Sequence, residues 1–172
     1  SWADRLHPDD SAATFAAFEN QRTDGFGPDR AASRTSAIAQ GAWEVSGGRL
    51  RLMSSGYAGR FDSPGVVALA DLDAGRLGRF DTYGVAQGGF SSRYQLVGQY
   101  DAEQGDGARL ELTPYAIRRV LELKQNYTGY LLDETHGDST QLLNESTTLG
   151  FTGQYQHPLR WLSEGDGLTV GV

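Results

Sequence analysis

Three acidic residues close to a glycine form the best candidate metal site in this sequence. Asp101, Glu103 and Asp106 lie in one short stretch just before Gly107. Calcium binds about 6–8 oxygen atoms, which closely spaced carboxylates and carbonyls can supply. The spacing differs from that of an EF-hand loop, so the alternative is an acidic turn between two strands. A calcium ion at these residues is the only cofactor that the sequence suggests.

Four aromatic residues are candidates for binding a sugar. An exposed aromatic ring can stack on the apolar face of a sugar and bury its CH groups. The alternative for each of these rings is packing in a hydrophobic core. The candidate ligand-binding residues are Tyr127, Tyr130, Tyr155 and Trp161.

The sequence contains none of the common catalytic motifs. It contains no nucleophile elbow, no phosphate-binding glycine loop and no pair of histidines at metal-ligand spacing. The histidines, His7, His136 and His157, each lie beside turn residues or a proline, which favours exposed loop positions. We therefore assign no catalytic residue.

Composition excludes several classes of protein. The chain has 172 residues, 22 acidic and 15 basic, with a net charge of -7 and no cysteine. Disulfides and thiolate metal sites are thus excluded. The negative charge argues against nucleic acid and anionic lipid as partners, and no apolar run approaches the ~20 residues of a membrane-spanning helix. We expect neither a nucleic-acid nor a membrane partner.

The clearest structural signal is a β-hairpin over residues 41–53. Trp43 and Val45 alternate with polar residues, and Leu50 and Leu52 do the same after Gly47 and its neighbouring glycine. Alternation with a period of two indicates strands with one buried face, and a Gly-Gly pair between such runs is typical of a hairpin turn.

The rest of the chain reads as short strands joined by turns, with a short helix near the start. Asp9 to Ser11 can cap a helix, and Phe15 and Phe18 would share one of its faces. Residues 113–125 fit a helix or a strand, and the neighbouring hairpins favour the strand. Residues 22–40 and 56–65 read as loop or turn. Further strands are expected at residues 66–72, 80–85, 93–100, 109–113, 149–155, 159–162 and 168–172.

The order of these pieces resembles the concanavalin A-like lectin/glucanase superfamily, in the laminin-G-like form found in bacterial secreted proteins and phage virion proteins. The resemblance covers roughly residues 22–172, judged by hairpin order. It is carried by Phe26-Gly27, the Trp43 hairpin through Leu52, residues 94–101, residues 108–112 and residues 159–170.

This resemblance implies an all-β fold, a concanavalin A-like jelly-roll β-sandwich of antiparallel strands. It implies a single domain over residues 1–172, with residues 1–21 as a helical N-terminal extension. Family members carry further strands after the late hairpin, so the last strands are expected to be missing or supplied by a partner. Thr169 to Val172 would then be an open edge through which the chain could form a homo-oligomer.

The resemblance also frames the expected function. Glycoside hydrolases on this fold carry a Glu-x-Asp-x-x-Glu strand, which this sequence lacks, and Asp101 and Glu103 stand beside a turn. We therefore expect a non-catalytic module of a virion or cell-surface assembly, of the phage tail or capsid decoration type. It would bind glycan or a neighbouring structural subunit, in the virion or outside the cell. The alternative is a secreted polysaccharide-degrading enzyme, a glycoside hydrolase or lyase, on the same fold.

Overall fold

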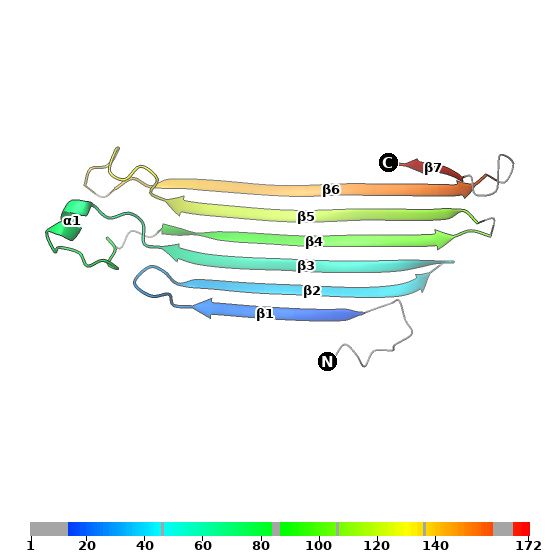
Figure 1. Cartoon of the computed structure of the whole chain (residues 1–172), viewed down its shortest axis with the longest axis horizontal. Coiled ribbons are helices and arrows are strands. Elements are labelled where there is room, and N and C mark those ends of the chain that lie inside the picture. The colour runs from blue at the N-terminus through cyan, green and yellow to red at the C-terminus, as the bar shows by residue number, and fades with distance from the viewer. Residues whose placement is uncertain (1–13, 46, 84–86, 106, 136, 160–166) are drawn as a thin grey trace.

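The computed structural model shows an all-β protein built as one seven-stranded antiparallel sheet. It describes residues 14–45, 47–83, 87–105, 107–135, 137–159 and 167–172. The strands follow one another across the sheet in chain order, as Figure 1 shows. They are β1 (Phe15–Thr23), β2 (Ala32–Val45), β3 (Gly48–Ser63), β4 (Gln87–Glu103), β5 (Arg109–Gln125), β6 (Thr140–Pro158) and β7 (Gly167–Gly171), and a short helix α1 (Leu69–Asp73) lies between β3 and β4.

The two ends of the sheet differ. At one end the strands are joined by tight hairpins, with Gly47 (φ 75°) between β2 and β3 and Gly107 (φ 82°) between β4 and β5. These backbone angles favour glycine, because other residues rarely adopt positive φ. At the other end the connections are longer, and the one between β3 and β4 includes α1 (Figure 1). We call these the short-turn end and the long-loop end.

The sheet has almost no buried core. Among the described residues, Ala108 is the only hydrophobic residue that is buried, and no large side chain is fully buried. Nothing in the described part of the chain forms a second layer over the sheet. The jelly-roll sandwich is therefore not confirmed, whereas the all-β antiparallel class is.

Several predicted elements are confirmed. The Trp43 hairpin is formed by β2 and β3, which pair from Val45 opposite Gly48 to Ala32 opposite Phe61. Residues 113–125 are strand, within β5. The strands expected at residues 93–100, 109–113 and 149–155 lie within β4, β5 and β6, and β7 covers most of the last one.

Other expectations are wrong. The expected helix is not confirmed: Phe15 and Phe18 lie on β1, and residues 1–13 lie outside the described residues. Pairing with β2 along the whole of β1 overrides the helix propensity of its alanines. Residues expected as loop at 32–40 and as turn at 56–63 belong to β2 and β3.

Two expected strands lie in the connection between β3 and β4. Residues 66–72 form no strand, and their second half begins α1. Of the strand expected at 80–85, residues 80–83 are not strand, and residues 84–86 lie outside the described residues. Most of the strand expected at 159–162 also lies outside them, since residues 160–162 are not described. Short apolar runs do not distinguish a buried strand from a loop that packs on its own residues.

Candidate functional site: the two faces of the sheet

Strand alternation and register separate the side chains into an apolar and a polar face. Residues directly opposite one another on neighbouring strands share a face. Trp43 lies opposite Leu50, which lies opposite Tyr100, and the face that these residues share is the apolar one. We call it the apolar face. Its large hydrophobic and aromatic residues are Phe18, Trp43, Val45, Leu50, Leu52, Phe90, Tyr94, Leu96, Tyr100, Leu110, Leu112, Val120, Leu143, Leu149, Phe151, Tyr155, Leu168 and Val170.

The large side chains of this face are exposed to an unusual degree. Leu149 is 77 % exposed and Phe18 is 72 % exposed. Leu96, Phe151 and Val170 are each more than half exposed. Contiguous apolar surface of this kind marks an interaction surface. The apolar face is therefore the strongest candidate functional site.

In the half of this face near the short-turn end, none of the described residues has a charged side chain. Across the sheet, the uncharged band runs on β4 from Ala102 to Leu96, a length of about 20 Å at about 3.4 Å per residue. Among the described residues, the first charged side chain beyond it is Arg118, which lies opposite Tyr94. Further towards the long-loop end the face carries Glu145, Glu122 and Lys124.

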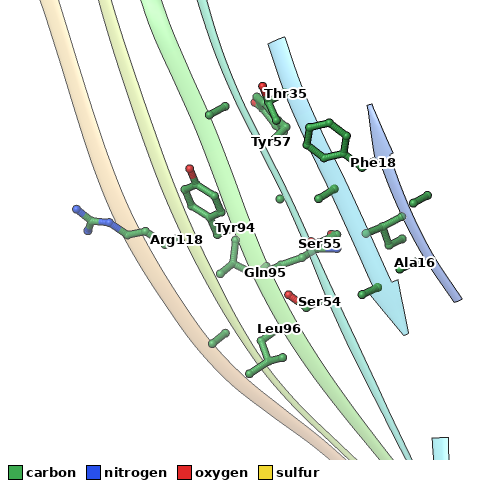
Figure 2. A pocket seen from close by; sticks show the side chains of 18 of the residues that line it. Ala16, Phe18, Thr35, Ser54, Ser55, Tyr57, Tyr94, Gln95, Leu96 and Arg118 are labelled. Carbon is green, nitrogen blue, oxygen red and sulfur yellow. The ribbon is translucent and has the colours of Figure 1, made fainter. Parts of the chain in front are cut away.

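A shallow groove crosses the middle of the apolar face. It has a volume of about 880 Å³ and is lined almost entirely by apolar atoms. Figure 2 shows Phe18 on β1 at one side and Tyr94 and Leu96 on β4 at the other. Small residues form the floor between them, because β2 and β3 contribute Ala37, Ala39, Ser54, Gly56 and Ala58.

The opposite face, which we call the polar face, carries charged and amide side chains. Near the short-turn end Arg109 forms ion pairs with Glu111 at 3.0 Å and Asp101 at 3.6 Å. Arg51 donates a hydrogen bond to Gln99 Oε1 at 3.0 Å. These side chains suit contact with water. Apolar residues lie among them on the same face, and they include Ile38, Met53, Val97, Ile117, Leu121 and Leu123.

The loop between β5 and β6 is organised by a buried carboxylate. Asp138 is only 5 % exposed. It accepts hydrogen bonds from the Thr128 hydroxyl and from the backbone N–H groups of Leu131, Leu132 and Asp133. The bond from Thr128, followed by those from the backbone, holds the pKa of Asp138 below its ordinary value. The role of Asp138 is to fix the loop.

A second contact joins two loops at the long-loop end. The rings of Tyr83 and Tyr130 meet edge to face, with centroids 5.9 Å apart. Tyr83 donates a hydrogen bond to Asp71 on α1, and with Arg76 this bond lowers the pKa of Asp71. Burial, reinforced by Tyr83, raises the pKa of Tyr130 to about 12. Tyr130 is therefore a packing residue between the loops in this structure.

The structure does not bring the four candidate sugar-binding aromatics together. Tyr127 and Tyr130 follow β5 at the long-loop end. Tyr155 lies on β6 near the opposite end, where its ring stacks on His157 with centroids 6.3 Å apart. Trp161 lies outside the described residues.

The candidate calcium residues are only partly described. Asp101 and Glu103 both lie on the polar face of β4, and Asp101 pairs with Arg109. Asp106 lies outside the described residues, as do His7 and His136. Within the described ranges, no group of three or more histidine, aspartate or glutamate side chains is placed to hold a metal ion.

Comparison with protein-family models, with curated proteins and with solved structures finds no match to this chain. In the part of the chain that the structure describes, no helix is long and apolar enough to cross a membrane.

Proposed function

We propose that this sheet is embedded in a lipid bilayer, with its apolar face against the hydrocarbon and its polar face against water. The observation that carries the proposal is the uncharged band on the apolar face, about 20 Å long on β4 at about 3.4 Å per residue, in which several large apolar side chains are exposed. Tilted strands of about 9–11 residues span the hydrocarbon of a membrane. The function of the sheet is then to form a wall between lipid and a water-filled space.

The aromatic residues at the borders of the band support this placement. Trp43 and Tyr100 occupy one row near the short-turn end, and Tyr155 lies one row further out. Tyr94 lies at the opposite border, next to Arg118. Tryptophan and tyrosine concentrate at the two interfaces of a bilayer, because their rings are amphipathic.

Strand length and pairing also suit a bilayer. Strands β2 to β6 are 14 to 19 residues long, and every neighbouring pair is antiparallel. An unpaired backbone group is costly in hydrocarbon. The proposal therefore requires that the outer edges of β1 and β7, and the part of β6 that β7 does not cover, pair with further strands when the sheet is in lipid.

Two adjacent residues on β6 provide the test. Leu149 is on the apolar face, Thr148 is on the polar face, and both are exposed. In lipid, Leu149→Arg should lower the free energy of unfolding by about 1–2 kcal/mol, since Leu149 lies in the row next to the charged border and not at the middle of the band. Thr148→Arg faces water and should change it by no more than about 0.5 kcal/mol. The measurement is urea unfolding of the full chain folded into phosphatidylcholine vesicles, with flotation to establish lipid association.

Equal effects of the two arginines would overturn the proposal, as would a folded protein that does not float with the vesicles. In the second case the apolar face would have to be covered by protein, as in the sandwich module that binds glycan or a neighbouring subunit. In water, both variants should lie within about 0.5 kcal/mol of the parent chain, because both positions are exposed.

A further inference from the structure

Two arginines face each other on the polar face. Arg93 on β4 lies directly opposite Arg119 on β5. Like charges at directly opposite positions destabilise an antiparallel pair of strands. Such a pair is expected where a negatively charged group compensates for the repulsion.

No carboxylate in the described part of the chain forms an ion pair with either arginine. Other arginines of the polar face do have acidic partners: Arg34 lies 2.9 Å from Glu19, and Arg109 lies 3.0 Å from Glu111. By register, the neighbours of the Arg93–Arg119 pair across the adjoining strands are Tyr57 and Ser146. The pair is thus a local concentration of positive charge in a chain whose net charge is -7.

The guanidinium group of Arg93 forms a hydrogen bond but does not use all of its donors. Its Nη2 atom donates a hydrogen bond to Gln95 Oε1 at 3.0 Å. Its Nε atom is buried and has no hydrogen-bond partner among the residues that the structure describes. A buried donor without a partner is unfavourable, so Arg93 has capacity for an acceptor that the described residues do not supply.

Next to Arg93 the polar face is hollowed. The hollow has a volume of about 380 Å³, and its polar lining includes Ser36, Ser55, Tyr57 and Gln95. The Tyr57 hydroxyl also lies 3.0 Å from the hydroxyl of Ser91, which holds the ring in place. Hydroxyl and amide donors therefore surround one side of the arginine pair.

We propose that Arg93 and Arg119 bind a small oxyanion with at least two negative charges on the polar face, at the edge of the hollow. Arg93 lines this hollow, and Arg119 lies opposite it on the neighbouring strand. Guanidinium groups match the planar, bidentate geometry of phosphate and carboxylate groups. A dianion would compensate both positive charges and accept from the free Nε of Arg93. The site goes beyond the proposed membrane function and does not depend on it. The polar face meets water whether lipid or protein covers the apolar face.

Calorimetric titration of the full chain in dodecyl maltoside micelles tests the site. Inorganic pyrophosphate and succinate serve as separate probes, at constant ionic strength, and distinguish phosphate from dicarboxylate chemistry. We expect one of them to bind, and we expect Arg93→Gln and Arg119→Gln each to weaken that binding at least tenfold. Arg118→Gln is the matched control, since this neighbouring arginine lies on the apolar face and pairs with Glu145. It should leave the affinity unchanged.

Thermal unfolding of the unmodified chain gives a second measurement that needs no variant. A ligand that binds only the folded state raises the unfolding midpoint, so the bound probe should raise it more than chloride does at the same ionic strength. Absence of heat with both probes would overturn the proposal, as would an equal loss of affinity in Arg118→Gln. If Arg93→Gln does not fold, Arg119→Gln and Arg119→Lys decide, and the lysine variant should retain part of the affinity.

Discussion

Tyr94 lies directly opposite Arg118, at the row where the apolar face of the sheet gives way to charge. Tyr94 is 52 % exposed, and Arg118 pairs with Glu145 and donates to the Thr147 hydroxyl at 3.1 Å. Between this row and the short turns, no charged side chain occurs among the described residues of the face. The Tyr94–Arg118 pair therefore marks the border between the uncharged and the charged part of this face.

Trp43 should report the environment at the other border. The chain has three tryptophans, so Trp2→Phe with Trp161→Phe leaves Trp43 as the only one. On transfer to vesicles we expect its emission to shift to shorter wavelength and to be quenched by brominated lipid, because its ring lies on the apolar face. Fluorescence spectroscopy with and without brominated lipid gives the measurement.

The control moves the same fluorophore to the other face. Ala42 precedes Trp43 on β2 and faces the polar side, so Ala42→Trp combined with Trp43→Phe places an indole at the same height. This indole should be quenched much less by brominated lipid. Equal quenching at the two positions would contradict the assignment of the faces.

Gly150 should resist substitution because a tyrosine ring occupies the space of its missing side chain. Gly150 lies opposite Tyr115, and a Cβ atom at position 150 would overlap the Tyr115 ring and hydroxyl. Gly150→Ala should lower the free energy of unfolding by about 1–3 kcal/mol. Most of this loss should disappear in a Tyr115→Ala background, measured as a double-mutant cycle in urea.

Gly59 provides the comparison for that cycle. It also lies inside a strand, but the nearest heavy atom to a Cβ built there is 3.5 Å away, an ordinary contact. Gly59→Ala should change stability by no more than about 0.5 kcal/mol. A similar loss at both glycines would mean that strand conformation, and not the Tyr115 ring, sets the cost.

The loop between β5 and β6 should loosen in acid. Hydrogen bonds from Thr128 and the backbone lower the pKa of Asp138 in the folded state. A lowered pKa stabilises the loop fully above the unfolded value of about 3.9, and this stabilisation is lost as the pH falls through the lower folded value. Hydrogen-exchange protection of the Leu132 and Asp133 amides, corrected for intrinsic rates, should therefore fall below about pH 4.

Asp138→Asn should reduce that protection at neutral pH and make it nearly independent of pH, because the amide has no charge to lose. Asp24→Asn is the control, since Asp24 is an exposed carboxylate beyond the end of β1. It should leave the acid transition in the loop unchanged. A transition that persists in Asp138→Asn would assign it to another group.

Local patterns predict the hairpins of this fold well. The alternation around Trp43 and the Gly47 turn each depend on a few neighbouring residues. The choice of strand for residues 113–125 was also correct, since their alternation continues through β5. Patterns that depend on adjacent residues are visible in a single sequence.

The full length of the strands was harder to predict, because small residues interrupt their patterns. Gly56 and Gly59 resemble turn residues, yet both lie inside β3, and Gly56 makes room for the Tyr94 ring. Likewise, alanines around Phe15 favour a helix in isolation, and only pairing with β2 makes this segment extended. These outcomes depend on residues distant in the sequence.

The apolar face is hard to recognise in the sequence, because in a strand only every second residue lies on one face. In β6 the residues Leu149, Phe151 and Tyr155 supply this pattern among polar neighbours. The Arg93–Arg119 pair depends on strand register, which joins positions that are far apart along the chain.

Because each strand of this sheet pairs only with its neighbours in the chain, the order in which the sheet comes apart is fixed by its connectivity. A force applied at the N-terminus would first peel β1 from β2, then β2 from β3, and so on across the sheet. Each step would break one row of backbone hydrogen bonds and leave the remaining strands paired. The chain would therefore unzip strand by strand under tension.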